Sequence, residues 1–315
     1  MKKVLLLGGI SSLLMLSSCD LLDDVSNAIN TTGLTETEMV SGLKEALVLG
    51  SKTAAFTLSD TTGTTNALGE VTGYFTNELV KIALPADAEN AFTIISKLNS
   101  VPGAATLLGV AGIDLSGYRD AIIKGLNRGA ETAAGLSADV FKDAVTQMTF
   151  TSAKTILFGT DSLGATNYLE TTTSATLTTG FTPIISSAFS AVKISAFGTD
   201  YSVTGVWSEF SVNYNKVAAA YQTLVSNASS ANPVTSSVAQ VSLATLSSAG
   251  VTSIDPLETN IVTYATGKAL DGLFLMVGKQ ELKIRRDPVA ALTAAGSFIT
   301  QTISDLIKKV FTASE

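Results

Sequence analysis

The sequence predicts an all-α fold, an irregular multi-helix bundle interrupted by polar insertions rich in Ser, Thr and Gly. Three observations predict this class. Apolar residues recur at spacings of three and four along most of the chain, which is typical of helices that bury one face. Only 6 of the 315 residues are prolines, so long stretches are free to be helical. Strand-like alternation of apolar and polar residues is confined to one insertion, residues 228–253.

The first helix has the clearest start signal. Thr35 and Glu38 are spaced as a capping box, in which each side chain accepts a hydrogen bond from the other residue's backbone amide. An apolar stripe follows at helical spacing. We expect a Thr- and Gly-rich loop over residues 57–73. Residues 75–85 are predicted to be either extended or helical, and residues 86–101 to be helical.

The middle of the chain is predicted to be a series of helices. We expect them over residues 118–134, 138–148, 152–157, 161–171, 174–192 with an interruption at Pro183, and 213–225. Residues 201–210, which contain the only tryptophan, have no clear pattern. Residues 228–253 form either a loose insertion or a small hairpin.

Two helices are expected to close the chain. Asp-Pro at residues 255–256 predicts the start of a long helix, with the Asp as cap and the Pro in the first turn. This helix contains the apolar run 273–277, and Gly272 or Gly278 is expected to break it. Residues 297–311 predict a final amphipathic helix.

Composition limits the chemistry that the chain can perform. The absence of histidine removes the Ser-His and Cys-His nucleophile pairs, the usual neutral-pH base and the commonest metal ligand. The single cysteine excludes an internal disulfide. A net charge of −7 disfavours phosphate backbones, so we predict no nucleic-acid partner. Nucleotide, metal and cofactor motifs are absent, and we predict no cofactor, no metal site and no catalytic residue.

The first residues resemble a bacterial lipoprotein signal. Two lysines precede an apolar stretch, residues 4–16, that is too short to span a membrane as a helix. Leu16, Ser17, Ser18 and Cys19 then resemble a lipobox. The resemblance implies that the Cys19 thiol carries a diacylglyceryl group and that cleavage follows Ser18.

We therefore expect a signal peptide over residues 1–18, a lipidated tether over residues 19–32 and a single helical domain over residues 33–315. The lipid would hold the protein in the bacterial cell envelope, with the outer membrane as the expected membrane. Whether the protein faces the periplasm or the cell surface stays open. Acidic residues after the cysteine resemble the surface-export signal of some Bacteroidetes lipoproteins, and a solvated linker explains them too.

Several segments carry a family resemblance. They are GLTETEMVSGLKEAL (33–47), NRGAETAA (127–134), FKDAVTQMT (141–149), AKTILFGTD (153–161), ATNYL (165–169), FTPII (181–185) and ALDGLFLMVGKQELKIRRDP (269–288). In order and spacing they resemble the bacterial envelope proteins grouped as domain-of-unknown-function family 4197. The resemblance implies a mostly helical, exported and often lipid-anchored module, and it implies no chemistry. The insertions near 57–73 and 228–253 depart from the family pattern.

Asn127, Arg128 and Glu131 are the first binding candidates. Arg128 and Glu131 are three positions apart, so they can pair on one helix face. In one interpretation Arg128 binds a carboxylate or phosphate of a ligand, and Glu131 orients it. In the other, the two residues form a structural pair or an interhelix contact.

Asp161, Tyr168 and Asp271 complete the candidates. Asp161 and Tyr168 lie near a predicted helix start, where free amides favour an anion, and a helix cap with a turn is the alternative. Asp271 belongs to a charged set around the apolar run 273–277. We interpret this set as a solvated helix face in which Glu281 pairs with Arg285; its other members are Lys268, Lys279, Lys283, Arg286 and Asp287.

These observations favour a lipid-anchored envelope protein that binds a protein, lipid or glycan partner, or has a structural role, without catalysis. The alternative is a hydrolase without histidine, or a lipid- or glycan-binding protein, that uses carboxylates and tyrosine. Two converging carboxylates in a pocket would favour the enzyme. A flat polar surface or an apolar groove would favour binding.

Overall fold

Two long helices pack side by side in the core. The computed structural model describes residues 33–110 and 114–313, and within them α2 (Glu36–Ser59) lies against α11 (Val262–Arg286). A third helix, α13 (Gln301–Thr312), crosses α2 at Gly42. Glycine is needed at this crossing, because a Cβ on Gly42 would lie 2.6 Å from the side chain of Val310.

The described residues contain twelve α-helices, one 3₁₀ helix and one two-stranded sheet, so the predicted all-α class is confirmed. The remaining elements are α3 (Ala86–Asn99), α4 (Ala104–Leu107), α5 (Tyr118–Ala134), α6 (Ala138–Gln147), α7 (Ala153–Phe158), α8 (Gly164–Ala191), β1 (Lys193–Ala196), β2 (Thr199–Ser202), α9 (Val203–Ala228), α10 (Pro233–Ser248), α12 (Pro288–Ala295) and η1 (Gly296–Phe298).

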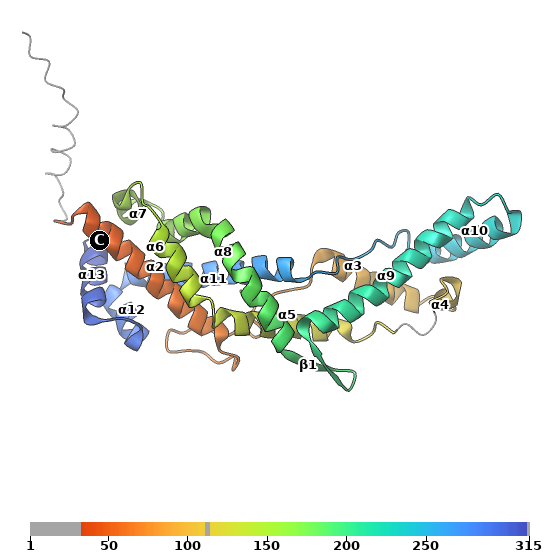
Figure 1. Cartoon of the computed structure of the whole chain (residues 1–315), viewed down its shortest axis with the longest axis horizontal. Coiled ribbons are helices and arrows are strands. Elements are labelled where there is room, and N and C mark those ends of the chain that lie inside the picture. The colour runs from red at the N-terminus through yellow and green to blue at the C-terminus, as the bar shows by residue number, and fades with distance from the viewer. Residues whose placement is uncertain (1–32, 111–113, 314–315) are drawn as a thin grey trace, which may run out of the picture.

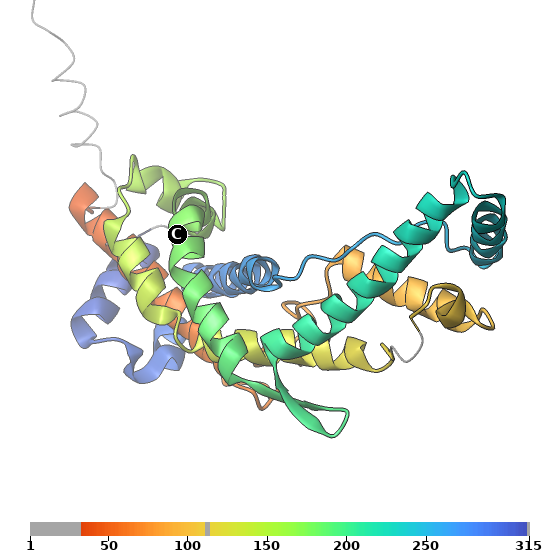
Figure 2. The same cartoon turned by 45° about the vertical axis from the view of Figure 1, so that its right-hand side comes forward.

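The molecule is elongated (Figure 1). The start of α2 and the helices α6, α7, α12 and α13 gather at one end, which we call the proximal end. Helices α3, α4 and α10 lie at the opposite end, which we call the distal end. Figure 2 shows how α8 and α9 meet at an angle beside the β1–β2 hairpin, so that α9 leads the chain away from the proximal helices.

The hairpin of the structure joins α8 to α9. Strands β1 and β2 pair antiparallel, with Ala196 opposite Thr199. The two residues of the turn, Phe197 and Gly198, both have positive φ (54° and 75°), which is the conformation that tight two-residue hairpins require. Residues 201–210, for which the sequence predicts no element, form the end of β2 and the start of α9.

The hairpin or loose insertion predicted over residues 228–253 is wrong. This segment contains helix α10, which packs on α9. Asn232 is its N-cap and accepts hydrogen bonds from the amides of Val234 and Thr235, and Pro233 occupies the first turn. The alternation of Val and Ser is therefore part of a helical pattern.

The predicted helix start at residues 255–256 is also wrong, because α11 begins at Val262. The side chain of Asn215 on α9 holds the preceding chain extended. Its Oδ1 accepts from the Leu257 amide at 2.7 Å, and its Nδ2 donates to the Leu257 carbonyl at 2.9 Å. Both backbone groups of Leu257 are thus withdrawn from helix formation.

The interruptions expected at glycine and proline do not occur. Gly272 and Gly278 lie inside the continuous α11, where they let neighbouring side chains approach. A Cβ on Gly272 would lie 2.6 Å from the Tyr74 ring. Helix α8 likewise runs through Pro183. The proline has no N–H, so the helix lacks one internal hydrogen bond there. Because Pro183 is exposed, its ring does not disturb the buried face of the helix.

Several helix limits are confirmed. The capping box at Thr35 and Glu38 starts α2, and α5 spans the predicted residues 118–134. Helix α7 lies close to the predicted range 152–157, and Ser152 is its N-cap. Among the residues that the structure describes, none of the helices combines the length and the apolar character needed to cross a membrane.

Helix α5 packs so closely on α8 that position 129 has room only for glycine. Gly129→Ala would place a Cβ 2.3 Å from the Phe189 ring, and we expect it to lower the free energy of unfolding by about 1–3 kcal/mol. Gly267→Ala is the matched control, since Gly267 is exposed in α11 and a Cβ there would have no neighbouring atom within 4 Å, and it should stabilise by about 0.5–1 kcal/mol. Urea unfolding measures both; equal effects would contradict the close contact.

The contact between α2 and α13 predicts a pH dependence. The hydrogen bond from Lys309, followed by the one from the Thr35 amide, lowers the pKa of Glu38 from 4.5 to about 2. Because the folded-state pKa is the lower one, this stabilisation is present above pH 4.5 and is lost as the pH falls towards 2. The stability difference between wild type and Glu38→Gln, measured by urea unfolding, should therefore shrink over that range. A difference independent of pH would contradict the contact.

Candidate functional site

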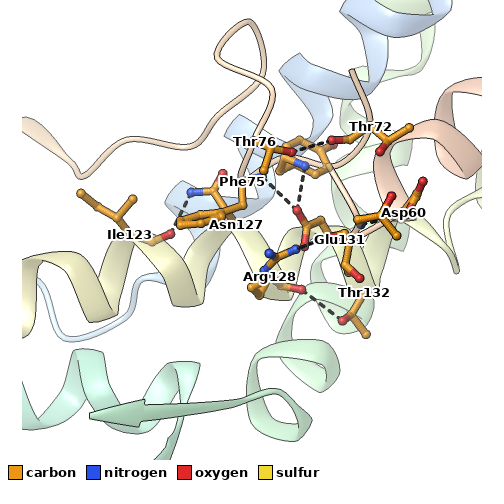
Figure 3. Close-up of polar contacts among 12 residues, drawn as sticks. Asp60, Thr72, Phe75, Thr76, Ile123, Asn127, Arg128, Glu131 and Thr132 are labelled. Atoms are coloured by element: carbon orange, nitrogen blue, oxygen red, sulfur yellow. Dashed lines mark hydrogen bonds and ion pairs between the residues drawn. The ribbon is translucent and has the colours of Figure 1, made fainter. Parts of the chain in front are cut away.

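The predicted candidates on α5 converge on a buried carboxylate (Figure 3). The side chain of Glu131 is 0% exposed. Its Oε1 accepts from the backbone amides of Tyr74 and Phe75 at 3.0 and 2.9 Å, and its Oε2 accepts from Arg128 at 2.8 Å. Gly73 allows this approach, because its φ is +76° and a Cβ there would lie 2.7 Å from Oε1.

Arg128 and Asn127 hold the same stretch of chain, residues 60–85, which we call the inner loop. Arg128 donates to the Thr61 carbonyl at 2.9 Å, and its guanidinium lies over the Phe75 ring. Asn127 is fully buried, accepts from the Ile82 amide and donates to the Ile82 carbonyl, both at 2.8 Å. Both carboxylate oxygens of Glu131 and both ends of the Asn127 amide are engaged by groups of the chain, which favours the structural interpretation for these two side chains.

Helix α11 holds the inner loop from its other side. Glu70 is buried and accepts from Gln280 at 2.9 Å and from Lys283 at 2.8 Å. Tyr74 is also buried and donates to the Ala269 carbonyl at 2.6 Å. Burial raises the pKa of the Tyr74 phenol well above its usual value, so this hydroxyl stays protonated as a donor.

A third buried carboxylate, that of Glu281, caps a helix. Glu281 of α11 accepts from the amides of Ala165 and Thr166, at 3.0 and 2.7 Å, at the start of α8. It also accepts from the Thr166 hydroxyl at 2.6 Å. A carboxylate at a helix N-terminus is stabilised both by the free amides and by the helix dipole.

Arg285 completes this arrangement at the end of α7. It pairs with Glu281 at 2.8 Å and donates to the carbonyls of Leu157 and Ile156 at 3.0 and 2.9 Å. The last carbonyls of a helix attract cations. The Glu281–Arg285 ion pair of α11 therefore caps the start of α8 through Glu281 and the end of α7 through Arg285. The predicted pairing of Glu281 with Arg285 is present.

The interpretation of this charged set as a solvated face is only partly correct. Glu281 and Gln280 are 6% and 5% exposed. The burial of Glu281 could have been predicted from its position in the sequence. Val277, Glu281 and Ile284 follow the helical spacing of the buried apolar stripe. Glu70 and Tyr74 carried no such signal, because the inner loop has no periodicity.

The other three candidates lie apart from α5. Asp161 accepts from the Leu163 amide and from the Asn167 side chain, both at 2.9 Å. Asp271 forms an exposed ion pair with Lys268 at 2.9 Å. Tyr168 donates to the Thr149 carbonyl at 2.6 Å and lines a groove between α6 and α8. Cys19 lies outside the described residues.

A groove of about 360 Å³ lies between α8 and α11. Asp271 lines this groove, and so does Asn167, which donates a hydrogen bond to Asp161. Two of the predicted candidates, Asp271 and Asp161, therefore lie in or next to the groove. Its lining is Leu163, Thr166, Asn167, Glu170, Asp271, Phe274, Leu275, Gly278, Lys279 and Leu282. Both carboxylates in it are exposed, whereas a general acid needs surroundings such as burial that raise its pKa.

Of three comparisons with known proteins, one gives a match. The family described as "Protein of unknown function (DUF4197)" matches residues 33–312. The chain matches no curated protein and no solved structure. In residues 33–110 and 114–313, no group of three or more acidic or cysteine side chains is placed to hold a metal ion.

The buried pair on α5 can be tested with a double-mutant cycle. Glu131→Ala strands two buried amides and should lower the free energy of unfolding by about 3 kcal/mol or more. Arg128→Ala should cost less, and the double variant should cost less than the sum by about 0.5–3 kcal/mol.

The exposed pair Arg119–Glu89 is the control for that cycle, because both of its side chains are more than a third exposed. Its coupling should be only about 0.2–1 kcal/mol. Additive effects of Arg128→Ala and Glu131→Ala, together with an unchanged melting temperature of Arg128→Ala and the loss of a molecule that co-purifies with the wild type, would show that Arg128 is kept for a ligand instead.

Proposed function

The chain belongs to the DUF4197 family of proteins of unknown function, and we propose that it is a lipid-anchored, non-catalytic binding module of the bacterial cell envelope. The observation that carries the proposal is the use of its buried charges. Glu70, Glu131 and Glu281 each accept from groups of the chain itself and pair with a lysine or arginine. These carboxylates therefore serve the architecture.

The shape of the molecule supports an anchored role. Residues 20–32 separate Cys19 from Gly33, which precedes α2 at the proximal end. A lipid on Cys19 would hold that end near the membrane and leave the distal end free to meet a partner. Two or more acyl chains are enough for stable anchoring, at ~0.8 kcal/mol for each buried methylene.

The groove between α8 and α11 favours one alternative, binding of a lipid or another amphiphile. Its apolar wall includes Leu163, Phe274 and Leu275, and Glu170 and Lys279 supply charges beside it. A groove that combines an apolar wall with a few polar groups is typical of ligand sites. Mass spectrometry of the small molecules and proteins that co-purify with the native lipoprotein distinguishes the two kinds of partner.

The anchor is tested by Cys19→Ser, which removes the thiol that would take the lipid. We expect this variant to lose incorporation of radiolabelled fatty acid and to leave the membrane fraction. Ser18→Ala is the matched control, because it keeps a small residue before the cysteine, and it should be lipidated normally. If Cys19→Ser stays with the membranes after a carbonate wash, lipid is not the tether.

A further inference from the structure

One long stretch of α9 and α10 differs from the rest of the molecule in charge. Charged residues make up 15% of the chain, yet residues 217–254 contain none. This stretch comprises the second half of α9, all of α10 and the turn that follows. The formal net charge of −7 resides elsewhere. Two copies of this protein repel one another over most of their surface, and the repulsion is weakest along this stretch.

Helix α10 leaves three valines exposed, and its fully buried residues are mostly small. Its contact with α9 uses small residues and one leucine, namely Ala239, Ser242 and Leu246. Three valines face solvent instead: Val234 is 72% exposed, Val238 61% and Val241 68%. Apolar side chains scattered singly on a surface are normal, but three aligned on one helix indicate an interaction surface.

The three valines and Thr245 follow one another at spacings of four, three and four residues. With 3.6 residues per turn they lie within an arc of roughly 60°. This spacing places the four side chains in one continuous stripe along the helix. β-branched side chains are stiff, so little rotamer freedom is lost when they are buried.

We infer that the Val234–Val238–Val241 face of α10 is a homotypic contact, through which two copies of the chain pair at their distal ends. A second copy presents the same uncharged valine stripe, so two such faces meet without opposing charges, and a two-fold interface brings identical surfaces together in this way. The contact is short, about four helical turns, and anchoring both copies in one membrane would raise their effective concentration.

A lipid surface is a poorer match for this face. Helices that lie in a membrane interface combine large apolar side chains such as Trp, Phe or Leu with Lys and Arg on the polar face. The exposed stripe has only valines, and α10 has no basic residue. The inference does not depend on the lipid on Cys19, because it rests on α10, which lies at the end of the molecule opposite the start of α2.

The test uses the full chain in its own membranes and a short bismaleimide crosslinker. Val238→Cys places a thiol at the centre of the stripe, and Ser247→Cys places one at an exposed position on a different side of α10. Both variants retain Cys19, so any crosslink through Cys19 appears equally in both. We expect Val238→Cys to give at least tenfold more product at twice the mass of the chain than Ser247→Cys.

Adding Val241→Glu to Val238→Cys should abolish that product, since it places a charge in each facing stripe. The glutamate is at an exposed position, so the melting temperature should not change. Equal crosslinking of the two cysteine variants, persistence of the product with Val241→Glu, or a product whose mass is not twice that of the chain would each overturn the pairing of two copies.

Discussion

Buried carboxylates that accept from backbone amides are the interaction on which the structure depends. Glu131 supplies partners for the amides of Tyr74 and Phe75, and Glu281 supplies them for Ala165 and Thr166. Backbone amides buried without a partner cost about 1–3 kcal/mol each, so these segments need such acceptors. The inner loop, residues 60–85, contains no helix and only an isolated bridge between Thr65 and Val71, so it satisfies only some of its own amides.

The same logic recurs along the molecule with other side chains. Asn127 and Asn215 each bind both backbone groups of one residue in an extended segment, Ile82 and Leu257 respectively. Glu36 accepts from the Ala153 amide at the start of α7. Polar residues on helices therefore organise the irregular chain between the helices, and this use accounts for the three α5 candidates without a ligand.

Sequence reasoning succeeded where local signals decide the structure. The capping box at Thr35 placed the start of α2, and apolar periodicity placed both ends of α5. An Asp-Pro or Asn-Pro pair does not by itself decide whether a helix starts there. Residues 232–233 and 287–288 do start helices, whereas residues 255–256 do not, because Asn215 holds the following chain extended. That competing contact spans about 40 residues of sequence and leaves no local trace.

The candidate site shows the same division. Pairing of Arg128 with Glu131 followed from their spacing, but the burial of Glu131 depends on a loop 56 and 57 residues away. Amide hydrogen exchange of Glu281→Gln tests the structural role of these carboxylates most directly. We predict faster exchange at Ala165, Thr166 and the first turn of α8, together with a lower free energy of unfolding. Unchanged exchange and stability, with loss of a molecule that co-purifies with the wild type, would contradict this account.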